Sequence, residues 1–66
     1  MTLNKNELIN IRKELYKLSG IIGTHAELTS NIELIEAYDY MSKALDCIEN
    51  YGYDNDWIDI ETNEVK

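Results

Sequence analysis

The fold is decided by residues 30–51, whose sequence is SNIELIEAYDYMSKALDCIENY. Apolar side chains recur in this stretch at steps of four and three residues, which places them along one side of an α-helix. They are Leu34, Tyr38, Met41, Leu45 and Ile48. Ser30 and Glu33 form a capping box in front of them, and the pattern ends near Gly52. The stretch therefore predicts an amphipathic helix over residues 31–51.

The preceding segment carries a second apolar stripe with the same spacing. Its members are Leu8, Ile11, Leu15, Leu18 and Ile22. Asn4 followed by Glu7 resembles a capping box, so this helix is expected to begin near Asn4. Gly20 and Gly23 are alternative stop signals, because glycine after a helix can adopt the left-handed conformation that closes the last carbonyls.

The connection between the two stripes is not expected to be bare loop. Thr24 and Glu27 form one more capping box within it. This spacing predicts either a short helix over residues 24–29 or an early start of the second helix.

Two such stripes on one short chain predict an all-α fold, an antiparallel helical hairpin in which each stripe is buried against the other. In the expected register an acidic and a basic side chain also meet on the flank of the seam. The pairs expected to face each other are Ile22 with Leu34, Leu8 with Ile48, and Lys5 with Glu49.

The chain divides into a helical hairpin domain over residues 1–53 and an acidic tail over residues 54–66. The tail is expected either to serve in contacts or to pack back on the hairpin through Trp57. Isoleucines alternate with acidic residues over residues 58–61, which is a weak strand pattern.

The hairpin leaves apolar residues uncovered, and 66 residues are close to the lower limit for a self-sufficient core. Ile9 and Tyr16 lie two turns apart on a further stripe of the first helix, and Leu28, Ile32 and Ile35 lie near the connection. We expect a dimeric four-helix bundle, with Ile9 and Tyr16 in self-association, or docking of these residues on a partner.

Charge is divided unevenly along the chain. Residues 1–22 carry four basic and two acidic side chains, a net charge of +2, whereas residues 23–66 carry eleven acidic and two basic ones, a net charge of −9. The total of −7 repels nucleic acid and anionic membranes and attracts basic protein surfaces. The second helix alone has roughly one net charge per 8 Å, against one per about 1.7 Å of duplex DNA. One helix is therefore a poor copy of DNA, although the tail or a dimer would narrow the difference.

Candidate partner-binding residues combine this charge with aromatic side chains. Tyrosine and tryptophan offer a large contact area and a polar edge at a small entropic cost, and they often lie beside carboxylates here. The predicted contact residues are Glu36, Asp39, Tyr40, Asp46, Tyr53, Asp54, Asp56, Trp57 and Asp59.

Catalysis, cofactors and metals have little support. The sequence lacks a glycine-rich phosphate loop, and the chain is short for a substrate pocket of ordinary size. The tail carboxylates do not follow EF-hand spacing, and His25 has too few neighbouring ligands for zinc. Cys47 is the single cysteine, and no apolar run approaches the roughly 20 residues of a membrane span. We expect no enzyme, no cofactor, no metal and a cytoplasmic location.

The leading hypothesis is a small acidic protein that binds and inhibits a larger basic protein, such as a nuclease or another nucleic-acid-binding protein. Antitoxins, immunity proteins and phage products directed at host or defence machinery act through compact acidic surfaces, and the composition fits an AT-rich genome such as a phage's. The alternative is a self-assembling helical module or an adaptor whose tail adds a strand to a partner's sheet. Neither hypothesis involves direct contact with nucleic acid or membrane.

Overall fold

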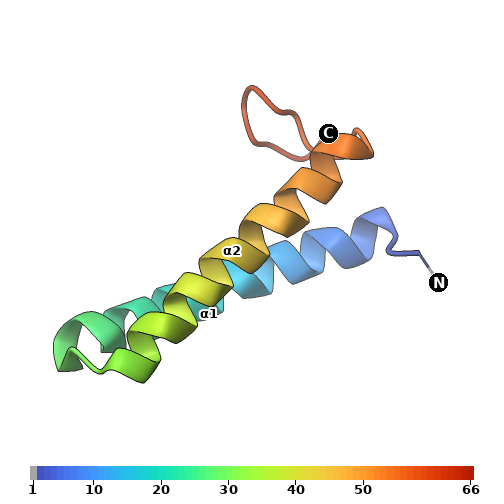
Figure 1. The fold of residues 1–66 in the computed structure, drawn as a ribbon. Helices are drawn as coiled ribbons and strands as arrows, with labels where there is room; N and C mark the ends of the chain where they lie inside the picture. Colours follow the sequence, from blue (N-terminus) through green and yellow to red (C-terminus); the bar gives the residue numbers. More distant parts are fainter. Residues whose placement is uncertain (1) are drawn as a thin grey trace.

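The computed structural model describes residues 2–66, which form two long helices joined by a two-residue turn. Helix α1 spans Lys5–Thr29 and helix α2 spans Ile32–Asp54. They pack in opposite directions, so the start of α1 and the end of α2 lie at the same end of the molecule (Figure 1). The predicted all-α antiparallel hairpin is confirmed. None of the helices in residues 2–66 is long and apolar enough to cross a membrane.

The start of α1 is determined by the predicted capping box. The side chain of Asn4 accepts a hydrogen bond from the backbone N–H of Glu7 at 2.8 Å. The Glu7 carboxylate in turn accepts one from the backbone N–H of Asn4 at 3.1 Å. The two bonds satisfy donors that a helix N-terminus otherwise leaves open.

The prediction that this helix ends at Gly20 or Gly23 is wrong, because α1 continues well beyond both. Gly23 instead allows a close approach, since a Cβ atom there would lie 2.9 Å from the Tyr38 ring. The hydroxyl of Thr24 donates to the carbonyl of Gly20 inside the helix and does not cap a new one. Both alternatives for residues 24–29, a separate short helix and an early start of the second helix, are therefore wrong, because these residues belong to α1.

The turn is shorter than expected and uses a different cap. Ser30 closes α1 in the left-handed conformation, with φ 53°, and its N–H donates to the carbonyl of Ala26 at 2.8 Å. Asn31 opens α2, since its side chain accepts from the N–H of Leu34 at 3.1 Å. The predicted capping box of Ser30 and Glu33 is therefore wrong, because the αL backbone of Ser30 belongs to the end of α1.

The short turn changes the register of the hairpin by one to two helical turns. Residues at equal distances from the turn face one another, so the register follows directly from the turn's position. The observed neighbours across the seam are Gly23 with Tyr38, Arg12 with Glu49, and Leu8 with Gly52. The predicted pair of Lys5 and Glu49 is wrong, because Glu49 pairs with Arg12 and Lys5 donates to the backbone carbonyl of Lys66.

The α1 side of the seam is more polar than the predicted stripe. Its buried and half-buried residues at heptad spacing are Lys5, Leu8, Arg12, Leu15, Ser19, Ile22 and Ala26, with the half-buried Gly23 beside them. Arg12 and Ser19 take the places expected for Ile11 and Leu18, which are exposed. Tyr38, expected in the core stripe of α2, is also exposed at its edge although its ring lies on Gly23.

The C-terminal tail folds onto the open end of the hairpin. After α2 ends at Asp54, the N–H groups of Trp57 and Ile58 both donate to the carbonyl of Gly52, at 2.9 and 3.3 Å. The chain then reverses, and Ile58 and Val65 form an isolated antiparallel bridge. Within the described residues, the weak strand pattern of the tail thus gives a single bridge and no strand.

The hydrophobic core is small and includes a residue of the tail. Leu8, Ala26 and Ile58 are the buried apolar side chains of residues 2–66. The molecule measures 39 × 28 × 15 Å, with a radius of gyration of 13.4 Å. A compact protein of this length has a radius of gyration of about 11 Å. The hairpin is therefore a flat, elongated layer.

Candidate functional site

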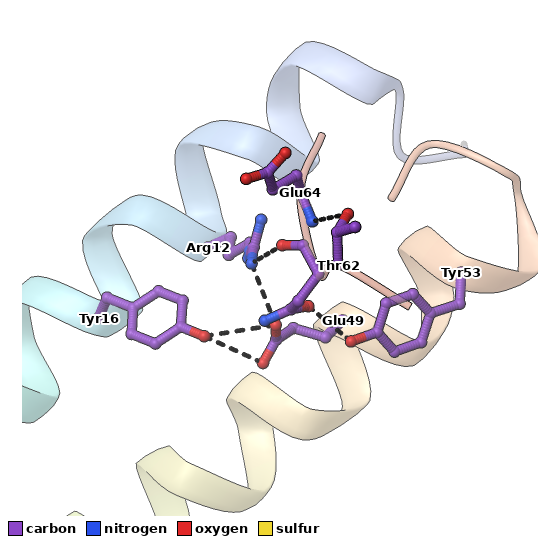
Figure 2. A network of polar contacts seen from close by, with 7 residues as sticks. Arg12, Tyr16, Glu49, Tyr53, Thr62 and Glu64 are labelled. Atoms are coloured by element: carbon purple, nitrogen blue, oxygen red, sulfur yellow. Dashed lines mark hydrogen bonds and ion pairs between the residues drawn. The ribbon is translucent and has the colours of Figure 1, made fainter. Parts of the chain in front are cut away.

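An ion pair between the helices anchors the tail. Nη2 of Arg12 lies 3.3 Å from Oε2 of Glu49 and donates to the carbonyl of Asn63 at 2.7 Å. The hydroxyl of Tyr16 is 3.4 and 3.3 Å from the two carboxylate oxygens of Glu49, and the guanidinium lies 5.6 Å from the Tyr16 ring centroid. Figure 2 shows Arg12 and Tyr16 of α1 pointing toward Glu49 of α2. Because Arg12 and Glu49 are largely buried, each partner offsets the desolvation of the other.

Asn63 is the point where the tail meets both helices. Its backbone carbonyl is held by Arg12 of α1, and its side-chain oxygen accepts from the Tyr53 hydroxyl of α2 at 2.6 Å. Its φ of 61° places it in the left-handed region, which asparagine tolerates better than most residues. Lys5 adds a bond to the carbonyl of Lys66 at 2.5 Å. The tail is thus held by side chains from both helices.

The bends of the tail are stabilised by its own carboxylates. One oxygen of Asp59 accepts from the backbone N–H groups of Glu61 and Thr62, at 2.8 and 3.4 Å. Asp56 has φ 60° and forms an ion pair with Lys66. This hydrogen bond with Asp56, helped by the nearby Asp59 charge, raises the pKa of Lys66 above its usual value. These acidic side chains are therefore fixed in position rather than spread along a free tail.

Several of the predicted contact residues meet in one shallow depression of about 390 Å³ at the end of α2. The depression combines four carboxylates, one ammonium group and three apolar or aromatic side chains. Its lining residues are Tyr53, Asp54, Asp56, Ile58, Asp59, Ile60, Glu61 and Lys66. Ile60 is 75% exposed at this site, whereas Ile58 is buried beneath it. The structure thus brings together Tyr53, Asp54, Asp56 and Asp59.

Three further predicted acids lie along the outer side of α2. Glu36, Asp39 and Asp46 are exposed and lie at heptad spacing, which continues through Asn50 to Tyr53, the chain neighbour of Asp54. Lys43 interrupts this row of acids. The row continues into the depression, and we call the two together the acidic band. Its residues are Glu36, Asp39, Asp46, Asp54, Asp56, Asp59 and Glu61.

Two of the three aromatic contact candidates, Tyr40 and Trp57, lie outside the acidic band, whereas Tyr53 lines the depression. Tyr40 is exposed on α2, with Nζ of Lys43 5.9 Å from its ring centroid. Trp57 is half-buried, and its ring is tilted against Tyr51 at a centroid distance of 5.8 Å. The two rings are therefore not part of the depression.

The two residues predicted for self-association already have contacts within the chain. Ile9 is half-buried, and the Tyr16 hydroxyl is bonded to Glu49. Both line a small hollow of about 220 Å³ with Arg12, Lys13 and Val65. The tail residue Val65 thus lies beside Ile9 and Tyr16, on the surface predicted for self-association.

The structure shows no candidate metal-binding site among residues 2–66. No three His, Cys, Asp or Glu side chains there are close enough together to hold an ion. His25 and Cys47 are both exposed. The acidic band is thus a surface rather than a coordination site.

Comparison with known proteins finds no match. No family model, curated protein or solved structure matches this chain. Its function is therefore inferred from its own geometry and charge.

The residues that sequence reasoning missed are Arg12, Glu49 and Asn63, which hold the tail in place. A signal for Arg12 exists in the sequence, because it continues the heptad spacing from Leu8 to Leu15. No local pattern marks Asn63, since its role depends on a contact 51 positions along the chain.

Proposed function

We propose that this protein is a non-enzymatic, acidic binding protein that inhibits a larger basic, nucleic-acid-binding protein by covering its basic surface. The observation that supports this most is the acidic band, in which the ordered tail extends the acids of α2 into one surface. A disordered tail of the same charge would lose more entropy on binding. The pre-formed band avoids that loss.

The charge density of the band favours docking on a basic surface over close imitation of DNA. From Glu36 to Asp54 the band runs about 27 Å along α2 at 1.5 Å per residue. Over this length its four acids are offset by Lys43, which leaves a net charge of −3, and the tail acids with Lys66 bring the whole band to −5. Duplex DNA carries about 16 charges over the same length. The band therefore suits electrostatic steering and a polar contact region rather than a phosphate-by-phosphate match.

The depression supplies the apolar part that an interface also needs. Tyr53 and Ile60 lie among its carboxylates. Aromatic or aliphatic side chains surrounded by polar groups are typical of binding hot spots. A basic side chain from the partner could reach the carboxylates while its aliphatic stem covers Ile60. Steering by the band and anchoring in the depression would act together.

We place this activity in the cytoplasm, that of the host if the protein is encoded by a phage. The chain has a single cysteine, Cys47, so its fold does not depend on an internal disulfide and is compatible with a reducing compartment. Phage inhibitors, antitoxins and immunity proteins are the classes whose size and charge fit best.

The test uses a pair of variants that change the charge equally. Asp39→Lys with Asp54→Lys alters the band at two exposed residues, and Glu27→Lys with Glu64→Lys alters two exposed acids outside it. Each tagged protein captures partners from host lysate, a salt gradient releases them, and mass spectrometry identifies them. We expect a basic nucleic-acid-binding protein to be retained by the native chain and the control but not by the band variant.

The captured protein is then tested for inhibition. Its binding to a labelled DNA or RNA duplex is measured by fluorescence anisotropy with increasing amounts of native chain, band variant or control. Competition by the native chain and control, with at least about tenfold weaker competition by the band variant, is the expected result for two lost charge contacts. Equal capture and competition by all three proteins would show that the band is not the binding surface.

A further inference from the structure

One face of α1 is apolar, exposed and not used by the hairpin. Ile11, Leu18, Ile21 and Leu28 are 36, 43, 49 and 77% exposed. With Glu14 and His25 they follow heptad spacing over about 26 Å of helix. We call these six residues the outer stripe. The stripe lies on the other side of the α1 seam from Tyr16, Gly20 and Gly23, which line the groove between the helices.

The outer stripe has the same order of apolar and polar residues when it is read from either end. Counted inward, Ile11 corresponds to Leu28, Glu14 to His25, and Leu18 to Ile21. An antiparallel pair of identical helices with its two-fold axis between Ser19 and Gly20 would bring these corresponding residues together. We propose that the outer stripe is the interface between two copies of this chain, packed with their α1 helices antiparallel.

The proposed residue pairs also agree with the known geometry of antiparallel helix packing. In that geometry each first apolar heptad position faces the second apolar position of the partner, and Ile11, Leu18 and His25 would face Leu28, Ile21 and Glu14. The six contacts form three types of layer, of which two are apolar and one is polar. No layer places an apolar side chain against a charge.

Charge complementarity selects a second copy in this orientation. Glu14 of each copy faces His25 of the other, so that the imidazole N–H can donate to the carboxylate in two symmetric places. A parallel pair would instead place Glu14 against Glu14 and His25 against His25, which is unfavourable for both. The two polar residues of the stripe therefore specify direction as well as partner.

The accessible surface of the chain is larger than that of a compact monomer, as expected if a second copy covers part of it. The accessible surface is 4988 Å² for a mass of 7.7 kDa, whereas a compact monomer of that mass exposes about 4300 Å². The excess of about 700 Å² is close to the roughly 800 Å² that each partner buries in a stable interface. A second hairpin on the outer stripe would complete a four-helix, two-layer molecule.

The outer stripe lies on α1, whereas the acidic band lies on α2 and the tail, so a dimer would present two bands. The inference does not depend on the proposed function, because it concerns only the association of the chain with itself. A dimer could form whether or not a basic partner exists.

The experiment is sedimentation equilibrium of the full chain from about 1 µM to 1 mM. Leu18→Asp is compared with Ile35→Asp, because both parent side chains are 43% exposed but Ile35 lies on the groove side. We expect a dimer for the native chain, a dimer for Ile35→Asp, and at least about 100-fold weaker association for Leu18→Asp, which would place a charge in an apolar layer. Circular dichroism at low concentration verifies that each variant is helical.

A charge exchange tests the direction of packing. Glu14→Lys places a lysine opposite His25, and His25→Glu places a glutamate opposite Glu14. Each variant is expected to weaken the dimer by about tenfold. The double variant restores opposite charges and should return to within about threefold of the native association. A chain that stays monomeric up to 1 mM would overturn the proposal, as would loss of the dimer with Ile35→Asp alone. A double variant weaker than both singles would overturn the antiparallel pairing.

Discussion

At the scale of single residues, two helical glycines differ in whether the structure has room for a Cβ atom. A Cβ atom at Gly52 would lie 2.5 Å from Cδ1 and 2.8 Å from Cγ1 of the buried Ile58. A Cβ atom at Gly20 would meet nothing within 4 Å. Gly52 is thus needed so that the tail can pack against α2, whereas Gly20 only weakens its helix.

We therefore expect Gly52→Ala to destabilise the fold and Gly20→Ala to stabilise it. Displacement of Ile58 should cost about 1–3 kcal/mol of unfolding free energy, as overpacking usually does. The alanine at Gly20 should add about 0.5–1 kcal/mol through helix propensity. Urea denaturation followed by circular dichroism measures both values. If Gly52→Ala is as stable as the native chain, the tail does not pack on α2 as described.

The seam of α1 explains an error at this same scale. Reading apolar residues alone selects Ile11 and Leu18, yet Arg12 and Ser19 lie in the seam. Arg12 can be buried because Glu49 lies opposite it. Ser19 is buried because its side chain is small enough to fit beside α2, although its hydroxyl has no hydrogen-bond partner. Both conditions depend on the partner helix, so the heptad spacing that passes through Arg12 and Ser19 does not by itself show that they are buried.

At the scale of elements, the ends of the helices were only partly predictable. The capping box of Asn4 and Glu7 depends on residues three apart and was found correctly. The boundary at Ser30 and Asn31 was placed wrongly, because both residues can cap a helix and the sequence pattern does not show which one takes the left-handed conformation. That choice then determines the register of the whole hairpin.

Substitutions at the turn distinguish the two roles. Ser30→Gly is expected to raise the unfolding free energy by about 0.5–1 kcal/mol, because glycine adopts φ 53° without steric strain. Asn31→Ala is expected to lower it by about 1 kcal/mol, because it removes the bond to the N–H of Leu34. Thermal and urea unfolding of the two variants provide the measurement. Destabilisation by Ser30→Gly would instead indicate that Ser30 caps α2.

At the scale of the whole molecule, one polar cluster joins α1, α2 and the tail (Figure 2). Arg12 contacts all three parts through Glu49, Tyr16 and Asn63, although its Nε is buried without a hydrogen-bond partner. A buried pair of this kind offsets its own desolvation and adds little net stability. Removing only one member leaves a charge that is largely shielded from water.

The expected behaviour is therefore strongly non-additive. Arg12→Met should cost about 2–4 kcal/mol by leaving the Glu49 carboxylate unpaired, with a comparable loss for Glu49→Leu. The double variant should recover at least about half of either loss, because two packed apolar side chains replace the ion pair. The double-mutant cycle is measured by urea denaturation. Additive losses in the cycle would contradict the burial and pairing described for these residues.

The sequence by itself determined the all-α class, the two amphipathic helices and the first cap, because these depend on contacts within about one helical turn. It also determined the acidic character of α2 and the tail. Only the tertiary structure decided the register, the polar seam and the assembly of Asp54, Asp56 and Asp59 into one depression. Those features depend on contacts such as Arg12 with Asn63, whose partners lie far apart in the chain, so no local pattern contains them.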